Sequence, residues 1–220
     1  MSLSKNIQIT EALYTYILDH STPPDAVQEE LIERTRTSLG NRAGMQIPPE
    51  QGTFLTLLTK LVAPRFAVEV GTFTGYSALA IARGLPEGGR LLCCDVSEEW
   101  TAVAREAWLK AGVTDRIELR IAPALDTLNA LPSSPHIDLA FVDANKDGYV
   151  DYWEALIPRM NPGGLVLADN VLYSGDVVSP APGSGAEGVH RFNEHVRADP
   201  RVEAVILPVA DGLTFARVLG

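Results

Sequence analysis

The sequence FAVEVGTFTGYS, residues 66–77, joins a short apolar run to a turn that carries two glycines. A short apolar run that ends at a glycine turn is typical of a buried strand in a parallel sheet. The stretch therefore predicts a strand, a tight turn and a helix that begins near residue 75.

The same pattern recurs along the chain. Apolar runs predict strands at residues 66–70, 90–94, 117–121, 137–142 and 164–168, with helices that begin near residues 75, 97, 123 and 147. This alternation favours a parallel sheet with right-handed crossovers.

The C-terminal part departs from that pattern. Val202–Leu207 and Leu213–Val218 are joined by residues 208–212, a link too short for a crossover helix. They are expected to form an antiparallel hairpin. The predicted fold is an α/β domain with a seven-stranded, mostly parallel sheet and helices on both faces.

The chain is expected to form one domain over residues 1–220, with an N-terminal helical segment at 1–64 and an α/β core at 65–220. Helical spacing over residues 8–39 is interrupted at Pro23-Pro24. A further helix is predicted from Pro49 to about Val62, and one of its faces would carry Phe54, Leu57, Leu58 and Leu61. Glycine, proline and serine dominate residues 174–188, which we interpret as a long loop; such a loop serves either as an active-site lid or only as a mobile insertion.

Composition narrows the functional class. The net charge is −10 and no basic stripe is present, so nucleic acid is not an expected partner. The only two cysteines, Cys93 and Cys94, are adjacent, which favours a buried role in a reducing compartment. With no apolar stretch near 18 residues and no signal pattern, the expected location is cytoplasmic, without a membrane partner.

The turn after the first strand predicts a nucleoside cofactor. Its Gly71-x-x-x-Gly75 spacing matches neither the dinucleotide G-x-G-x-x-G motif nor a phosphate-binding P-loop. Asp95, at the end of the second strand, is placed to accept hydrogen bonds from ribose hydroxyls. A loop flanked by Glu69 and Asp95 suits a cationic nucleoside, and S-adenosylmethionine (SAM) is such a cation. The alternative is that the glycines serve the turn alone and Asp95 caps the next helix.

Two further strand ends carry polar side chains. Asp143 follows the run HIDLAFV, and Asp169 and Asn170 follow the run GGLVLA. Because parallel strands end at the same edge of a sheet, these side chains are expected to meet. Two carboxylates and an amide oxygen, with positions open for water and substrate, suit Mg²⁺, with Mn²⁺ or Ca²⁺ as alternatives.

A calcium-binding EF-hand competes with this interpretation. The residues from Asp143 to Gly148, with Glu154 downstream, satisfy the loop pattern. An EF-hand requires a helix before the loop, however, whereas residues 137–142 have the pattern of a strand.

Lys146 is a candidate catalytic residue. The chain has four lysines and fourteen arginines, so a lysine beside the acidic strand ends indicates a role that needs an amine. Lysine can lose its proton when it is desolvated near a cation, which arginine cannot.

At these residues the chain resembles the cation-dependent class I O-methyltransferases, the caffeoyl-CoA and catechol O-methyltransferase group. The resemblance rests on these segments: Ala12-Leu13-Tyr14-x-Tyr16-Ile17, Met45 with Glu50-Gln51-Gly52, Val68 to Ser77, Asp95 with Glu99-Trp100, Ala122-Pro123-Ala124, Asp143-Ala144-x-Lys146, Asp169-Asn170 and Asp211-Gly212. It covers nearly the whole chain and implies a Rossmann-like class I methyltransferase fold.

The resemblance also implies roles for individual residues. The implied cofactor contacts are Ile47, Glu69, Gly71, Thr72, Ser77, Asp95, Ala124 and Asn145. Asp143, Asp169 and Asn170 match the metal ligands of the family, and Lys146 matches its catalytic base. Lys5, Asp143 and Ser174 match substrate contacts.

Two positions depart from the plant pattern. Asn145 replaces a second aspartate on the cofactor side, and Ser174 replaces a substrate-contacting asparagine. Both departures concern the identity of the substrate more than the type of reaction.

The sequence thus predicts Mg²⁺-dependent transfer of a methyl group from SAM to one hydroxyl of a catechol-type, phenolic small molecule. A homodimer is expected, because related enzymes pair and the N-terminal helices and the C-terminal hairpin exceed a minimal methyltransferase sheet. The alternative is a non-enzymatic regulator that binds calcium or a nucleotide.

Overall fold

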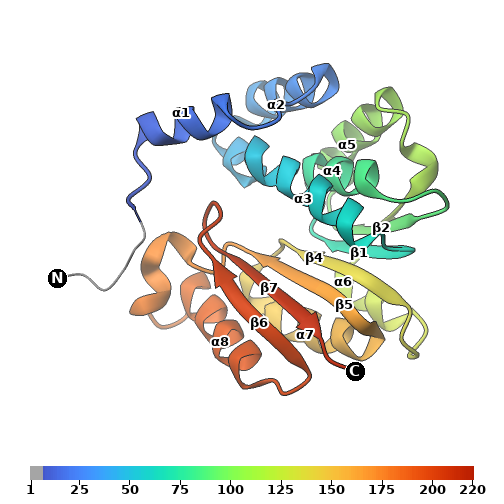
Figure 1. Ribbon diagram of the computed structural model, residues 1–220, viewed down its shortest axis with the longest axis vertical. Coiled ribbons are helices and arrows are strands. Elements are labelled where there is room, and N and C mark those ends of the chain that lie inside the picture. The colour runs from blue at the N-terminus through green and yellow to red at the C-terminus, as the bar shows by residue number, and fades with distance from the viewer. Residues whose placement is uncertain (1–6) are drawn as a thin grey trace.

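The computed structural model describes residues 7–220, which form one seven-stranded sheet with helices on both faces (Figure 1). The strands are β1 Phe66–Val70, β2 Arg90–Asp95, β3 Ile117–Ile121, β4 Ile137–Val142, β5 Met160–Asp169, β6 Val202–Leu207 and β7 Leu213–Val218. The helices are α1 Glu11–Asp19, α2 Ala26–Leu39, α3 Pro49–Val62, α4 Tyr76–Gly84, α5 Glu98–Lys110, α6 Ala124–Asn129, α7 Tyr149–Leu156 and α8 Gly185–Ala198. Short 3₁₀ helices span Gly40–Met45, Thr114–Arg116, Lys146–Gly148, Ile157–Arg159 and Tyr173–Val178.

The strand order is β3-β2-β1-β4-β5-β7-β6. Strands β1 to β5 pair in parallel, whereas β7 runs antiparallel to both β5 and β6. The predicted seven-stranded sheet with a C-terminal antiparallel hairpin is confirmed. Most predicted strand bounds are also correct, although β5 begins four residues earlier than expected, at Met160.

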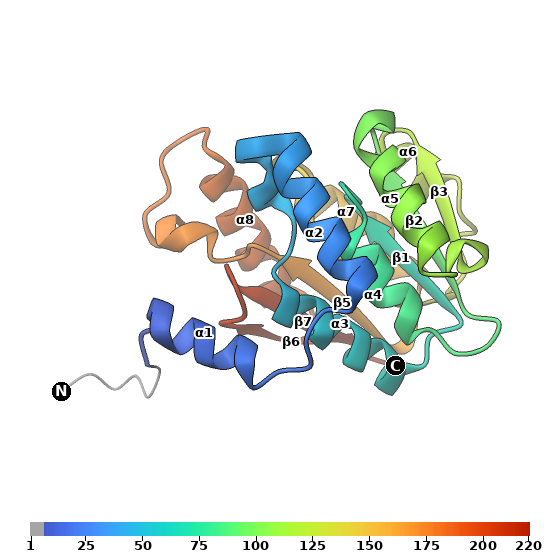
Figure 2. The ribbon, with the colours of Figure 1, turned by 90° about the horizontal axis from the view of Figure 1, so that it is seen from above.

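Two apolar layers cover the sheet because successive side chains of a strand point to opposite faces. Ala67 and Leu91 pack with helices α2 to α5, whereas Val68 and Leu92 pack with α6 to α8. The two views place these helix groups on opposite sides of the sheet (Figure 2). Burial on both faces explains why the central strands are almost continuously apolar.

The N-terminal helices differ from one another in how they pack. Helix α1 has no buried residue and lies at the margin of the molecule in both views. Helix α3 buries Leu55 and Leu58, but Leu57 is 55% exposed and Leu61 is 83% exposed. The predicted bounds of this helix are correct, and the predicted apolar face of Phe54, Leu57, Leu58 and Leu61 is only partly buried.

The segment 174–188 is more regular than predicted. The 3₁₀ segment extends to Val178 with a left-handed kink at Ser174 and Gly175, and α8 begins at Gly185, so residues 179–184 and this kink are irregular. Ser184 caps α8 by accepting a hydrogen bond from the Glu187 N–H at 3.3 Å. Within residues 7–220, no helix is long and apolar enough to cross a bilayer.

Candidate active site

The carboxyl ends of β1, β2, β4 and β5 meet at one edge of the sheet. Val142 of β4 is in register with Ala168 of β5, so Asp143 and Asp169 leave the sheet side by side. The Asp143 N–H also donates to the Val70 carbonyl of β1 at 2.8 Å. This parallel register, rather than closeness in sequence, brings the predicted residues together.

The loop after β1 can form only with glycine at its first position. Gly71 has φ +90°, and a Cβ placed there would lie 1.9 Å from the backbone oxygen of Asp143. The two loops therefore pack backbone against backbone. Gly75 has φ +83°, and its carbonyl accepts a hydrogen bond from the indole N–H of Trp108 at 3.1 Å. Both glycines are thus required by close approach as well as by a left-handed backbone.

Asp95 organises the cofactor loop. Its Oδ2 accepts the backbone N–H groups of Thr72 and Phe73 at 2.9 and 2.8 Å, and its Oδ1 accepts that of Ser97 at 2.8 Å. Since a carboxylate has about four acceptor positions, roughly one remains for a ribose hydroxyl. Asp95 therefore stabilises the turn after β1 and the start of the next helix, as the alternative interpretation of the sequence held.

Glu69 lies beneath the same loop and is fully buried. Neither carboxylate oxygen has a hydrogen-bond partner among the described residues. Burial raises the pKa of Glu69 to about 7, against the opposing effect of the nearby Ser77 and Thr72 hydroxyls. Burial thus favours the protonated, neutral form of this acid behind the loop.

A cavity of about 820 Å³ opens above these strand ends. It is lined by seven of the eight predicted cofactor residues, namely Ile47, Gly71, Thr72, Ser77, Asp95, Ala124 and Asn145. Asp143, Lys146, Asp169 and Asn170 line it as well. Glu69 does not line the cavity but lies behind Gly71, Thr72 and Ser77. The cavity is large enough for a nucleoside cofactor together with a small second substrate.

Lys146 joins two of the predicted metal ligands. Its Nζ donates to Asp143 Oδ1 at 2.9 Å and to Asn170 Oδ1 at 2.7 Å. A third hydrogen bond, of 2.7 Å, runs to the hydroxyl of Tyr149. Asn170 has φ +56°, a left-handed conformation that asparagine tolerates better than most residues. The lysine predicted to act as the base is thus held at the part of the cavity wall formed by Asp143 and Asn170.

Asp169 is almost fully buried. Its Oδ1 accepts the Asn170 N–H and its Oδ2 accepts the amide of Gln51, both at 2.8 Å. Burial, followed by the charge of Asp143, raises the pKa of Asp169 to about 7. The oxygen atoms of Asp143, Asp169 and Asn170 form the kind of donor set that a hard divalent cation takes. The residues present therefore fit such an ion.

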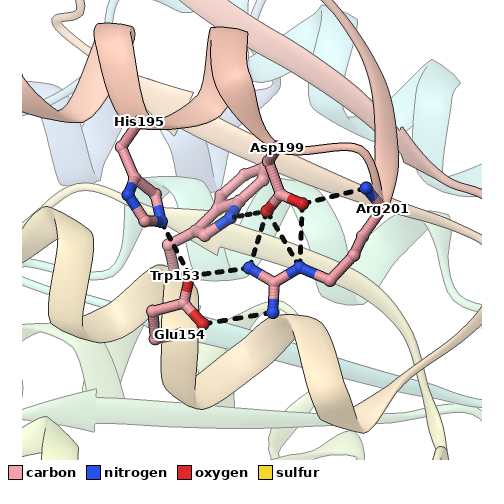
Figure 3. A network of polar contacts seen from close by, with 5 residues as sticks. All are labelled: Trp153, Glu154, His195, Asp199 and Arg201. Carbon is pink, nitrogen blue, oxygen red and sulfur yellow. Dashed lines mark hydrogen bonds and ion pairs between the residues drawn. The ribbon is translucent and has the colours of Figure 1, made fainter.

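The EF-hand alternative is wrong. Strand β4, not a helix, leads into Asp143, and the carboxylate of Glu154 points to other partners (Figure 3). Glu154 Oε1 lies 2.7 Å from His195 Nε2 and 2.6 Å from Arg201 Nη2. These pairs lower the pKa of Glu154. Glu154 is therefore not a ligand of the loop that begins at Asp143.

Figure 3 also shows a second cluster of side chains of metal-ligating types, formed by Glu154, Asp199 and His195. The guanidinium of Arg201 lies between the two carboxylates and donates to Asp199 Oδ2 at 2.6 Å. The Trp153 indole N–H donates to the same oxygen at 2.8 Å. A cation already fills this cluster, so we interpret it as an ion-pair network that joins α7, α8 and the start of β6.

The predicted substrate contacts have different outcomes. Asp143 lines the cavity, whereas Ser174 is exposed and does not line it. The Ser174 N–H donates to Asp211 Oδ1 at 2.7 Å, and Asp211 is the member of this pair that lines the cavity. No residue of 174–188 lines the cavity, so the predicted lid is not found. Lys5 lies outside the described residues.

Sequence reasoning missed several residues that line or support the cavity. Tyr152 donates to Asn145 Oδ1 at 2.6 Å, and Trp100 lies edge-on to Phe73 with ring centroids 5.3 Å apart. Gln51 appeared in the family resemblance without a role. Its position on a helix far from the strand ends in sequence gave no signal that it would reach Asp169.

The fold and this edge of the sheet define a class I methyltransferase. An O-methyltransferase from Bacillus cereus in complex with S-adenosylhomocysteine (SAH) superposes with a TM-score of 0.86. The two chains are 33% identical, over 94% of this chain and 97% of that one. The O-methyltransferase TomG from Streptomyces achromogenes, in complex with SAM, gives a TM-score of 0.87 at 30% identity, over 95% and 96% of the two chains.

Sequence comparisons identify the family. The family model described as O-methyltransferase matches residues 18–219. A caffeoyl-CoA O-methyltransferase from Eucalyptus gunnii is 37% identical over 97% of this chain and 90% of its own length. A probable caffeoyl-CoA O-methyltransferase 2 from Dictyostelium discoideum is 35% identical over 95% and 92%. The chain belongs to the O-methyltransferase family and is a SAM-dependent O-methyltransferase similar to the caffeoyl-CoA enzymes.

Proposed function

We propose that this enzyme transfers the methyl group of SAM to one hydroxyl of a vicinal dihydroxy aromatic compound and that it uses Mg²⁺. The observation that carries the proposal is the convergence of Asp143, Asp169 and Asn170 with Lys146 at one end of the cavity. Seven of the eight residues predicted to contact the cofactor line the same cavity. The cofactor and the methyl acceptor would thus bind in one cavity.

The chemistry requires an oxygen nucleophile. A phenol has an ordinary pKa near 10 and is a poor nucleophile at neutral pH. A divalent cation held by Asp143, Asp169 and Asn170 supplies positive charge that favours the phenolate form of the acceptor.

Lys146 is placed to guide the phenolic proton, and in its neutral amine form it can accept that proton, because its Nζ lies within hydrogen-bond distance of two of those three residues. The phenolate oxygen then forms a bond to the methyl carbon while the carbon–sulfur bond breaks, which leaves SAH. Holding both reactants in line in one cavity can lower the barrier by several kcal/mol.

The alternative of a calcium-binding regulator, considered from the sequence, loses its basis, since β4 and Glu154 do not form an EF-hand.

A methyl-donor assay over a panel of vicinal diphenols, with monohydroxy analogues as controls, tests the proposal. We expect methylation of the diphenols only, loss of turnover with EDTA and recovery with added Mg²⁺. Full activity after EDTA treatment, or equal methylation of the monohydroxy analogues, contradicts it.

We also propose that two copies of the chain form a homodimer. Four large apolar side chains on α3 and β6 are substantially exposed: Leu57 at 55%, Leu61 at 83%, Val205 at 50% and Ile206 at 41%. Strand β6 is also one of the two edge strands of the sheet, and an exposed edge strand is normally covered or otherwise protected. Exposed apolar surface of this kind supports burial against a second copy.

A further inference from the structure

Gln51 is a buried amide with a single side-chain hydrogen bond. It has no exposed surface, and its Nε2 donates to Asp169 Oδ2 at 2.8 Å, across 118 residues of sequence. Its Oε1 is buried and has no donor among the described residues. The contact with Asp169 is thus the one polar interaction that accounts for an amide at this position.

The backbone that carries Gln51 is fixed. Residue 52 is a glycine, and a Cβ there would lie 2.6 Å from Tyr76 Cε1, so α3 packs closely on the start of α4. Gln51 lies in the first turn of α3 (Pro49–Val62), three residues after Pro48, and lines the cavity together with Ile47 and Pro48. A rigid helix therefore presents the amide to Asp169.

The two donors hold the Asp169 carboxylate from both sides. The Asn170 N–H, on the adjacent residue, bonds to Oδ1, and the Gln51 amide bonds to Oδ2. A carboxylate bonded through both oxygens cannot rotate freely about its Cβ–Cγ bond. A neutral donor also fixes the orientation without adding a charge that would repel a cation.

We infer that Gln51 is a positioning residue, which orients the Asp169 carboxylate toward the divalent cation of the acceptor site. The inference rests on the proposed function, since it requires a cation at Asp143, Asp169 and Asn170. Hydrogen-bond partners of metal ligands typically contribute about 10–100-fold to metal affinity or activity.

The test replaces Gln51 with methionine, which has similar volume and no N–H donor. With SAH bound, Mn²⁺ titrated into the protein and followed by the electron paramagnetic resonance of the free ion should bind at least about tenfold more weakly to Gln51→Met than to wild type. The affinity for SAH should be unchanged, and the kcat should recover at saturating Mg²⁺. A purely structural role would instead weaken SAH binding or lower kcat at every metal concentration.

Thr59→Val is the matched control. Thr59 is equally buried on the same helix, but its hydroxyl bonds to the Leu55 carbonyl within α3. This variant should keep wild-type Mn²⁺ affinity. If Gln51→Met does not fold, Gln51→Asn provides the second test, because the same amide on a shorter side chain should no longer reach Asp169.

The outcomes separate the two proposals. Wild-type protein that binds no Mn²⁺ with SAH present overturns the proposed function itself. Wild type that binds Mn²⁺, together with a folded Gln51 variant whose Mn²⁺ affinity lies within about twofold of it, overturns only the role of Gln51.

Discussion

At the scale of the residue, three side-chain hydrogen bonds hold the amine of Lys146. Its Nζ bonds to a carboxylate, an amide oxygen and a tyrosine hydroxyl, from Asp143, Asn170 and Tyr149. The hydroxyl of Tyr149 in turn donates to the Asp169 carbonyl at 3.0 Å, and this ring is fully buried. Both the position and the direction of the lysine are therefore fixed by the ends of β4 and β5.

Replacing Lys146 with alanine should lower kcat by about 10²–10⁴-fold, the usual contribution of a general base. SAH affinity should be unchanged, and higher pH should restore part of the activity because hydroxide can then deprotonate the phenol. Steady-state kinetics from pH 7 to about 10 measure both effects. Lys110→Ala, at an exposed lysine paired with Glu30, is the control. Unchanged kcat in Lys146→Ala would remove the lysine from the mechanism.

Glu69 should make stability depend on pH. Its pKa rises from 4.5 to about 7 on folding, so the native state keeps a proton that the unfolded chain releases. The contribution of Glu69 to the free energy of unfolding is therefore most favourable below pH 4.5 and falls as the pH rises to about 7. At about 1.4 kcal/mol per unit, the loss amounts to roughly 3 kcal/mol.

Glu69→Gln removes this titration. Relative to wild type without cofactor, the variant should gain stability between pH 5 and pH 8, measured by urea unfolding at both values. A stability difference that is the same at the two pH values contradicts an acid protonated by burial.

At the scale of the element, the loops after β1 and β4 depend on each other. Gly71→Ala would bring a Cβ to 1.9 Å from the Asp143 oxygen. A left-handed backbone costs alanine about 1–2 kcal/mol, and overpacking adds about 1–3 kcal/mol. Thermal unfolding should show a loss of several kcal/mol. Gly88 has φ +76° and open space around it, so Gly88→Ala should lose only the backbone cost of about 1–2 kcal/mol in stability. Equal losses in the two variants would argue against the close loop contact.

The elements that the sequence predicted well are those with strong local signals. The central strands are buried on both faces and read as apolar runs, and the short link 208–212 leaves only a hairpin between β6 and β7. Polar residues directly after two apolar runs supplied the candidate ligands, the family resemblance matched them, and the parallel register of β4 and β5 places Asp143 beside Asp169.

The predictions from sequence were incomplete or wrong where tertiary contacts, rather than the local pattern, decide the structure. Residues 174–188 have the composition of a loop, yet Ser184 caps a helix whose first turn contains two glycines. Leu57 and Leu61 belong to the apolar face predicted for α3 but are exposed, because periodicity shows that apolar residues share a face and not that the face is buried. Gln51 reaches Asp169 only through the packing of α3 on α4, which no local pattern encodes.

At the scale of the whole molecule, the exposed apolar residues of α3 and β6 lead to a prediction about assembly. Wild-type protein at micromolar concentration should have the mass of a dimer by light scattering, and Leu61→Asp should shift it toward the monomer, because a buried unpaired charge is costly. Leu109→Asp is the control, since Leu109 is 71% exposed on α5. A monomeric wild type contradicts the proposed dimer, and a dimeric Leu61→Asp removes α3 from the interface.

The central claim is that a catalytic cation is held where β4 and β5 end. The most direct test is the Mg²⁺ affinity of Asn170→Ala and Glu154→Ala, measured by calorimetry with SAH bound. The first variant loses an oxygen ligand, whereas the second loses only an ion pair to Arg201 and His195. We predict that Asn170→Ala binds Mg²⁺ much more weakly than wild type and that Glu154→Ala binds it equally well. Wild-type affinity in Asn170→Ala, with loss of binding in Glu154→Ala, would contradict the account.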